Sequence, residues 1–136
     1  MKHKYNILIV DDEEEVLSEL KKSLDLEGYN VDTSFSAACA LEKVKRNKYH
    51  IVLTDIIMPH MDGLELLREI KKYDPMTQMI MMTESSTMDK ILNSLEYGAN
   101  DYIVKPMITP EVVTNVIDYS VQKLERWRSA FVQIVQ

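Results

Sequence analysis

The sequence predicts an α/β fold built on one doubly wound parallel sheet. Short apolar, β-branched runs alternate with segments of helical period, and the alternation recurs five times along the 136 residues. The runs are bounded by turn residues, as expected of buried strands joined through helices. The length corresponds to about one domain, which is long enough to bury a core.

The alternation assigns each element in chain order. The first helix carries Leu17, Leu20 and Leu24 on one stripe, and Gly28 follows it as a stop signal. The last helix begins with Thr109 as N-cap and Pro110 at its first position. The expected strands cover residues 5–10, 31–35, 50–54, 78–83 and 102–105, and the expected helices cover residues 14–26, 36–45, 63–72, 88–97 and 110 onward.

This pattern is typical of a flavodoxin-like (βα)5 fold with strand order 2-1-3-4-5. In such sheets, ligands bind beyond the carboxyl ends of the strands, at the switch point between the first and third strands. Asp11 and Asp12 follow the first strand, and Asp55 follows the third. The fold therefore predicts that three carboxylates converge at one edge of the sheet.

Composition bounds the function. A net charge of −6 argues against a nucleic-acid surface on this domain. The single cysteine, Cys39, excludes an intramolecular disulfide and fits the reducing cytoplasm. Because Cys39 lies between two alanines, we expect it to be a small buried apolar residue. No apolar run approaches the length of a membrane span, so we expect no membrane contact.

The last helix has no stop signal from Pro110 to Gln136 and would be about 40 Å long. We divide the chain into a domain over residues 1–124 and an extension of this helix over residues 125–136. Trp127 and Phe131 could cover the domain's own end, pair with a second chain or lead towards an output domain. Residues spaced alternately four and three apart form a heptad seam along the helix: Val113, Ile117, Ser120, Leu124, Trp127, Phe131 and Ile134.

Charge counting at the sheet edge points to a metal. Three carboxylates in a partly buried pocket cannot all stay ionised without counter-charge. Lys105, at the end of the fifth strand, supplies one positive charge, and a divalent cation would balance the other two. Oxygen ligands favour Mg²⁺, with Mn²⁺ as the alternative. Beside a cation and a lysine, Asp55 is a plausible nucleophile towards phosphorus, and Thr83 places a hydroxyl on the same rim.

At these residues the chain resembles the receiver domain, CheY-like, of bacterial two-component response regulators. The resemblance covers roughly residues 4–124. It rests on five segments in order, namely residues 10–13 (VDDE), 53–59 (LTDIIMP), 61–67 (MDGLELL), 82–83 (MT) and 101–106 (DYIVKP).

The resemblance implies a phosphorylation switch. Asp55 would accept a phosphoryl group from a sensor histidine kinase or a phosphotransfer protein. Asp12, Asp55 and the backbone carbonyl of Ile57 would hold Mg²⁺, with Asp11 acting through water. Lys105 would contact the phosphoryl group before a cis peptide to Pro106, and Thr83 and Tyr102 would form the switch pair. The readout would be the surface of the fourth helix, fifth strand and fifth helix, through which, together with the C-terminal helix, a homodimer could form.

The residues beside the site depart from the family pattern at one position. Glu84 stands where a small residue is usual, so it would add negative charge and slow phosphorylation of Asp55 by small phosphodonors. Ile57 and Ser85 would flank the attacking water and tune dephosphorylation. Because Ile57 is apolar and cannot orient water, a long-lived phosphoryl state is expected.

Two other functions compete with the switch. A phosphohydrolase of the haloacid dehalogenase type needs a second Asp two positions after the nucleophile, where this chain has Ile57. A degenerate receiver would act as an interaction module without phosphorylation, but the complete acidic set argues against it. We therefore expect a signalling switch with only its own phosphorylation and dephosphorylation chemistry. The cognate kinase and the output lie beyond the sequence.

Overall fold

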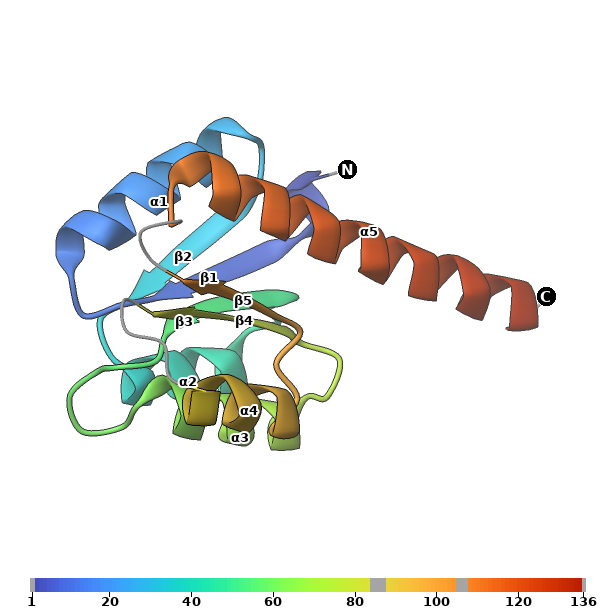
Figure 1. Ribbon diagram of the computed structural model, residues 1–136. Helices are drawn as coiled ribbons and strands as arrows, with labels where there is room; N and C mark the ends of the chain where they lie inside the picture. The colour runs from blue at the N-terminus through green and yellow to red at the C-terminus, as the bar shows by residue number, and fades with distance from the viewer. Residues whose placement is uncertain (1, 84–87, 105–107, 136) are drawn as a thin grey trace.

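The computed structural model describes residues 2–83, 88–104 and 108–135 (Figure 1). The predicted bounds of α1 and β4 and the predicted start of α5 are confirmed to the residue. The bounds of β1, β2, β3, α2, α3 and α4 differ from the predicted ones by one residue at one or both ends. β5 starts one residue earlier than predicted, and its predicted last residue, Lys105, lies outside the described residues. The strands are β1 (Asn6–Val10), β2 (Asn30–Ser34), β3 (Ile51–Asp55), β4 (Gln78–Thr83) and β5 (Asp101–Val104). The helices are a 3-10 turn (Lys2–Lys4), α1 (Glu14–Leu26), α2 (Ala37–Arg46), α3 (Gly63–Tyr73), α4 (Met88–Glu96) and α5 (Pro110–Val135).

The five strands form one parallel sheet in the predicted order β2-β1-β3-β4-β5. The register pairs Val10 of β1 with Thr54 of β3. Asp11 and Asp55 therefore each follow a paired residue at the same level of the sheet. This register brings the acidic residues of β1 and β3 to one edge.

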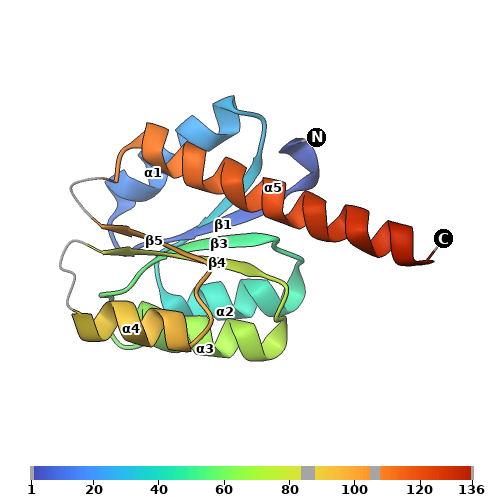
Figure 2. The ribbon, with the colours of Figure 1, turned by 45° about the vertical axis from the view of Figure 1, so that its right-hand side comes forward.

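Helices cover both faces of the sheet. In Figures 1 and 2, α1 and α5 lie on one face and α2, α3 and α4 lie on the other. Alternate residues of each central strand point into the two cores, because side chains alternate across a strand. Ile7 and Ile9 join the core under α1 and α5, whereas Leu8 and Val10 join the core over α2 and α3. A sheet buried on both faces explains why the strands read as continuous apolar runs.

α5 runs back from the carboxyl end of β5 and projects past the amino ends of the strands (Figures 1 and 2). Val113, Ile117 and Ser120 of the predicted seam are buried against the sheet. Trp127 and Phe131 are 66% and 67% exposed, which contradicts one of the three alternatives, that they cover the domain's own end. The helical period is the same in both halves, and the difference arises because the sheet ends before the helix does.

The placement of Cys39 corrects a second expectation. Its side chain is exposed on α2. The buried stripe of this helix consists of Ala37, Ala40 and Val44, which recur at helical spacing. Cys39 lies off that stripe because α2 starts after its N-cap Ser36, whose hydroxyl accepts a hydrogen bond from the Cys39 amide at 3.2 Å. Flanking alanines did not indicate which face the thiol would take.

Among the residues that the structure describes, no helix is both long and apolar enough to span a membrane.

Candidate functional site

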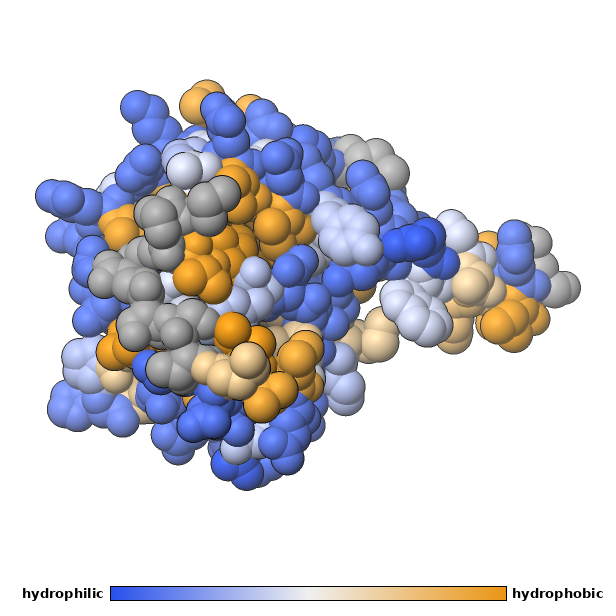
Figure 3. Space-filling model, in the orientation of Figure 1, coloured by the Kyte–Doolittle hydropathy of each residue, from blue (hydrophilic) through white to orange (hydrophobic). Residues whose placement is uncertain are grey.

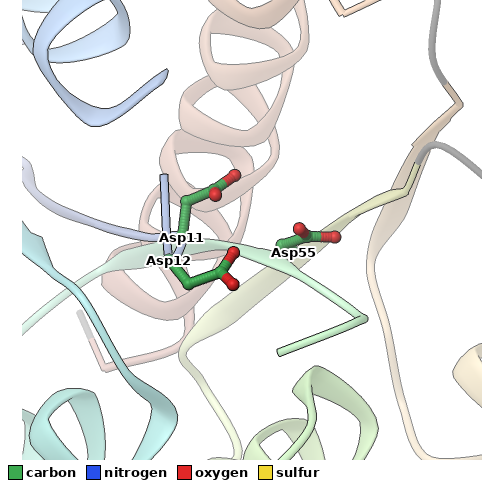
Figure 4. A group of neighbouring side chains, drawn as sticks. All are labelled: Asp11, Asp12 and Asp55. Carbon is green, nitrogen blue, oxygen red and sulfur yellow. The ribbon is translucent and has the colours of Figure 1, made fainter. Parts of the chain in front are cut away.

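The site consists of three aspartates at the carboxyl edge of the sheet. Figure 4 shows Asp11 and Asp12 at the end of β1 and Asp55 at the end of β3. One carboxylate oxygen from each residue lies within 4.8 Å of the others. Asp11 is 1% exposed and Asp55 is 9% exposed, whereas Asp12 faces solvent. The predicted convergence of these carboxylates is therefore present, with one solvent-facing member.

Backbone geometry at the end of β1 fixes the buried aspartate. The Asp11 amide donates to the Ser34 carbonyl at 3.2 Å, which ties the end of β1 to β2. The Asp11 carboxylate accepts a hydrogen bond from the Glu13 amide at 2.9 Å. This local bond turns the chain between β1 and α1, and it leaves Asp12 on the open side. The two consecutive aspartates therefore differ in exposure: Asp11 is buried beneath the rim, and Asp12 lies on its solvent side.

The loop after β3 folds back over the strand end and holds Asp55. The Ile56 amide donates to the Met82 carbonyl at 3.0 Å, and the Ile57 amide lies 3.4 Å from the Asp55 carboxylate. The Gly63 amide returns to the Ile56 carbonyl at 2.7 Å. The strand, the loop and the start of α3 together clamp the backbone on both sides of Asp55.

Gly63 is the position that sequence reasoning undervalued. A Cβ added there would lie 2.1 Å from the Asp55 carbonyl oxygen and 2.8 Å from the Ile56 Cα. Glycine is therefore required by close backbone approach to the site rather than by a left-handed turn. The positive φ of this loop belongs instead to His60, at 70°. A glycine eight residues after the strand-end Asp was the available signal.

Thr83 and Tyr102 are placed on neighbouring strands. Thr83 ends β4 and is fully buried, as the predicted position on the rim requires. Tyr102 of β5 pairs with Met81 and packs partly buried against the core over α2 and α3. Its hydroxyl is buried and has no hydrogen-bond partner among the residues that the structure describes. A cavity of about 220 Å³ beside it is lined by α4 and β5 residues, including Ile91, Ser94 and Leu95.

Four predicted site residues lie outside the described residues. They are Glu84, Ser85, Lys105 and Pro106, and their roles remain sequence predictions. Ile57 is described and is half exposed beside Asp55. The structure thus brings together Asp11, Asp12, Asp55 and Ile57, with Thr83 at the end of the strand next to β3.

The three carboxylates fit a hard divalent cation. Their oxygens are close enough to share one ion, and two of the three side chains are largely shielded from water. Such a group of like charges is costly without counter-charge, and oxygen donors suit Mg²⁺ better than zinc. Asp11, Asp12 and Asp55 are the residues that could hold the ion, and bound Mg²⁺ would offset charge on an incoming phosphoryl group.

The fold and the site together define a class: a flavodoxin-like signalling domain with an acidic cation pocket at its switch point. The family model described as the response regulator receiver domain matches residues 7–117. The chain therefore belongs to the receiver domain family of two-component response regulators.

Named relatives agree with this assignment. The chain is 36% identical over 110 residues to "Response regulator ArlR" of Staphylococcus saprophyticus, covering 81% of this chain and 50% of that protein. It is 34% identical over 113 residues to "Uncharacterized transcriptional regulatory protein YkoG" of Bacillus subtilis, covering 83% of this chain and 50% of that protein. The chain thus spans about half the length of these curated relatives.

Solved structures confirm the fold. A CheY-like receiver domain protein from Methanospirillum hungatei aligns with a TM-score of 0.87 at 34% identity, covering 90% of this chain and 97% of that one. The BeF3-activated DrrB receiver domain aligns with a TM-score of 0.79 at 28% identity, covering 87% of this chain and 97% of that one.

Proposed function

We propose that this domain is a phosphorylation switch whose phosphoacceptor is Asp55. The observation that carries the proposal is the convergence of Asp11, Asp12 and Asp55 at the switch point of the sheet. The similarity to proteins named as response regulators and to a BeF3-activated receiver domain supports it. The source of the phosphoryl group would be a phosphohistidine of a sensor kinase or a phosphotransfer protein.

In the proposed reaction an Asp55 carboxylate oxygen attacks the phosphorus of the phosphohistidine. The O–P bond forms while the N–P bond breaks, and the imidazole leaves with the bonding electron pair. Asp12, Asp55 and the Ile57 carbonyl would hold Mg²⁺, and Asp11 would assist from its buried position. The clamp on the Asp55 backbone orients the carboxylate, and Lys105 is assigned to the phosphoryl oxygens from sequence. Mn²⁺ can take the place of Mg²⁺ in such an oxygen site.

The proposed switch couples this charge change to α4, β5 and α5. The Thr83 hydroxyl would move towards the phosphoryl group, and the Tyr102 ring would turn into the vacated space. Two observations support this movement of the Tyr102 ring. A cavity lies beside the ring, and its hydroxyl has no hydrogen-bond partner among the residues that the structure describes. The α4-β5-α5 face would then bind a second copy, because Met88, Leu92 and Leu95 expose apolar side chains on α4.

Stoichiometric labelling tests the proposal. The protein is incubated with MgCl2 and acetyl phosphate, and intact-mass spectrometry should detect one added phosphoryl group per chain. Asp55→Asn should remove the adduct, and chelation with EDTA should prevent it. A fully labelled Asp55→Asn variant would refute the assignment of the acceptor.

The same experiment separates the two competing functions. Multiple turnover of the phosphodonor would favour a phosphohydrolase, although Ile57 stands where such an enzyme needs its acid. No adduct under any condition would favour an interaction module that works without phosphorylation. Under the switch proposal, each chain takes up one phosphoryl group, which is then slowly hydrolysed. This reaction would take place in the cytoplasm.

Ile57 offers a test of phosphoryl lifetime. Its side chain is half exposed beside Asp55, and an apolar group there gives the attacking water no hydrogen-bond partner. Ile57→Asn should shorten the half-life of the adduct by several-fold, measured after removal of the donor. An unchanged half-life would contradict this role.

Glu84→Ala should speed labelling by acetyl phosphate, and equal rates would remove Glu84 from the mechanism.

A further inference from the structure

The end of α5 projects from the domain, and residues 122–135 are named here the α5 extension. This range starts three residues before the extension over residues 125–136 that was expected from the sequence. Its seam residues Trp127, Phe131 and Ile134 are 66%, 67% and 82% exposed. Figure 3 shows both apolar and hydrophilic surface on this projecting end. An exposed apolar stripe that contacts nothing in its own domain is typical of a partner-binding helix.

The charges beside the stripe are all of one sign. With Leu124 and Phe131 at a positions and Trp127 at d, Lys123 occupies a g position and Arg128 an e position. These two positions flank the contact surface between paired helices. Glu125, the single acid of the extension, is a b position, and its carboxylate interacts with Tyr5 of the domain. The e and g positions beside the stripe therefore offer an approaching helix two cations, Lys123 and Arg128.

Pairing of the extension with itself would oppose these cations. In a parallel pair, Lys123 of one copy lies beside Arg128 of the other. In an antiparallel pair that sets Trp127 against Phe131, the two Arg128 side chains lie beside each other across the axis. Like charges at these positions disfavour the pairing and select a different partner.

A groove at the base of the extension continues the cationic surface. Its volume is about 350 Å³. Tyr5, Met76 and Leu124 give it apolar walls, and Lys4 and Arg128 add positive charge at its edge. Lys48 also lines it but is paired with Asp74 at 2.6 Å. Because Leu124 of the seam and Arg128 beside the seam both line the groove, one ligand could contact both surfaces.

A membrane surface fits the charge distribution less well. Lys123, Arg126 and Arg128 against Glu125 give the extension a net charge of +2, so the remainder of a chain with −6 in total carries −8. Binding to an anionic bilayer would bring this acidic domain close to an extended plane of like charge. A single helix would touch the extension and the groove without that repulsion.

We propose that the α5 extension binds an acidic amphipathic helix of another protein. The apolar face of that helix would cover Trp127, Phe131 and Ile134, and its acidic side chains would meet Lys123 and Arg128. This assignment stands apart from the phosphorylation proposal, because the extension projects past the amino ends of the strands, opposite the aspartate rim. It also differs from the pairing with a second chain, which was one of the three alternatives left open by the sequence for Trp127 and Phe131.

Trp127 is the only tryptophan and reports directly on the surface. The probe is a tryptophan-free 21-residue peptide with leucine at a and d and glutamate at e and g. A matched peptide carries lysine at e and g. Titration of the full chain with the acidic peptide should shift Trp127 emission to the blue. The acidic peptide should bind at least tenfold more tightly than the basic one.

Two double variants with the same net-charge change locate the effect. Lys123→Gln with Arg128→Gln should weaken binding of the acidic peptide about tenfold. Gln122→Glu with Gln133→Glu, on the outer side of the helix, should change it by less than twofold. Labelling of Asp55 by acetyl phosphate should be equal in both variants, so this result and the test of the switch are independent.

Three outcomes would overturn the proposal. Equal affinity for the two peptides, or equal weakening in the two double variants, would reduce the effect to nonspecific charge. A blue shift that appears on concentrating the chain alone would assign the extension to a second copy. A shift with phosphatidylserine vesicles but not with the acidic peptide would assign it to a membrane surface.

Discussion

The aspartate rim and the α5 extension are the two charged surfaces of this domain, and they are built in opposite ways. At the rim, the backbone clamp formed by the Ile56 and Gly63 amides fixes Asp55, and Asp11 is almost wholly buried. On the extension, Trp127 and Phe131 are two-thirds exposed and contact no core. The fold itself holds the rim in place, whereas under our proposal the exposed stripe of the extension would be covered by a partner.

This difference has a physical origin. The like charges that converge at the rim repel one another, which costs free energy of folding. The surrounding fold offsets this cost by fixing the backbone that carries them. The extension stores no such cost, because Arg126 and Arg128 are exposed, Lys123 lies over the Tyr119 ring and the helix satisfies its own backbone. Mutations should therefore act on stability at the rim and on binding at the extension.

The strongest way to break the comparison is to disturb the clamp. Gly63→Ala should destabilise the fold by about 4 kcal/mol or more, because the new Cβ meets backbone atoms that cannot move independently. Urea denaturation monitored by circular dichroism measures the effect. Gly28→Ala is the matched control. It has a positive φ of 97°, but the added Cβ would make only an ordinary contact with the Lys2 Cβ at 3.9 Å, so about 1 kcal/mol is expected. An equal loss of stability in the two glycine variants would show that the backbone around Asp55 can move to accommodate the new Cβ.

The two halves of α5 sharpen the comparison within one helix. Ile117→Ala should cost about 3 kcal/mol, because Ile117 is fully buried against the sheet. Phe131→Ala, two heptads further along the same stripe, should change the free energy of unfolding by less than about 0.5 kcal/mol. Urea titrations at two protein concentrations provide the measurement. A large, concentration-dependent cost at Phe131 would mean that the extension already has a partner.

Removing one charge from the rim should stabilise the metal-free protein. Asp11→Asn keeps an oxygen to accept from the Glu13 amide but removes one of three like charges, so stability without Mg²⁺ should rise on the order of 1 kcal/mol. The same variant should bind Mg²⁺ about tenfold more weakly. Thermal unfolding with and without MgCl2 tests both effects. Glu19→Gln, an exposed change on α1, should alter neither, and a destabilised metal-free Asp11→Asn would contradict the repulsion.

The smallest effect concerns a titrating group remote from the rim. Burial, with the charge of Lys48 as a second cause, lowers the pKa of His50. The unfolded chain then binds the proton more readily, so stability present above about pH 6.5 declines as the pH falls through that value. His50→Asn can still accept from the Asn6 amide and should lose less stability between pH 7 and pH 5. Parallel slopes for the two proteins would exclude His50 as the cause.

Sequence patterns predicted the elements well because each strand and helix has a strong local signal. The buried strand β4 has a continuous apolar run, Met79 to Met82, between Gln78 and Thr83, and α1 has one leucine stripe and a glycine stop. The strand order followed from the alternation of elements and the rule for parallel sheets. Boundaries shifted by a residue where the register extended a strand, as at Asp55, which belongs to β3 itself.

The sequence predicted the convergence of Asp11, Asp12 and Asp55 but not the details of their placement. Asp11 and Asp12 are adjacent and chemically identical, so nothing local distinguishes the buried carboxylate from the exposed one. The need for Gly63 depends on the loop folding back onto Asp55, a contact between residues eight positions apart. Cys39 illustrates the same limit, because its small neighbours are shared by the buried and exposed faces of α2.

By itself, the sequence determined the alternation of strands and helices, the acids at two strand ends and the continuous period of the last helix. These features depend on neighbours within a few residues, so local chemistry suffices to specify them. The tertiary structure decided which aspartate is buried, why Gly63 must lack a side chain and where the stripe of α5 passes from core to solvent. Those outcomes depend on which distant atoms cover a given face, and periodicity carries no information about what covers it.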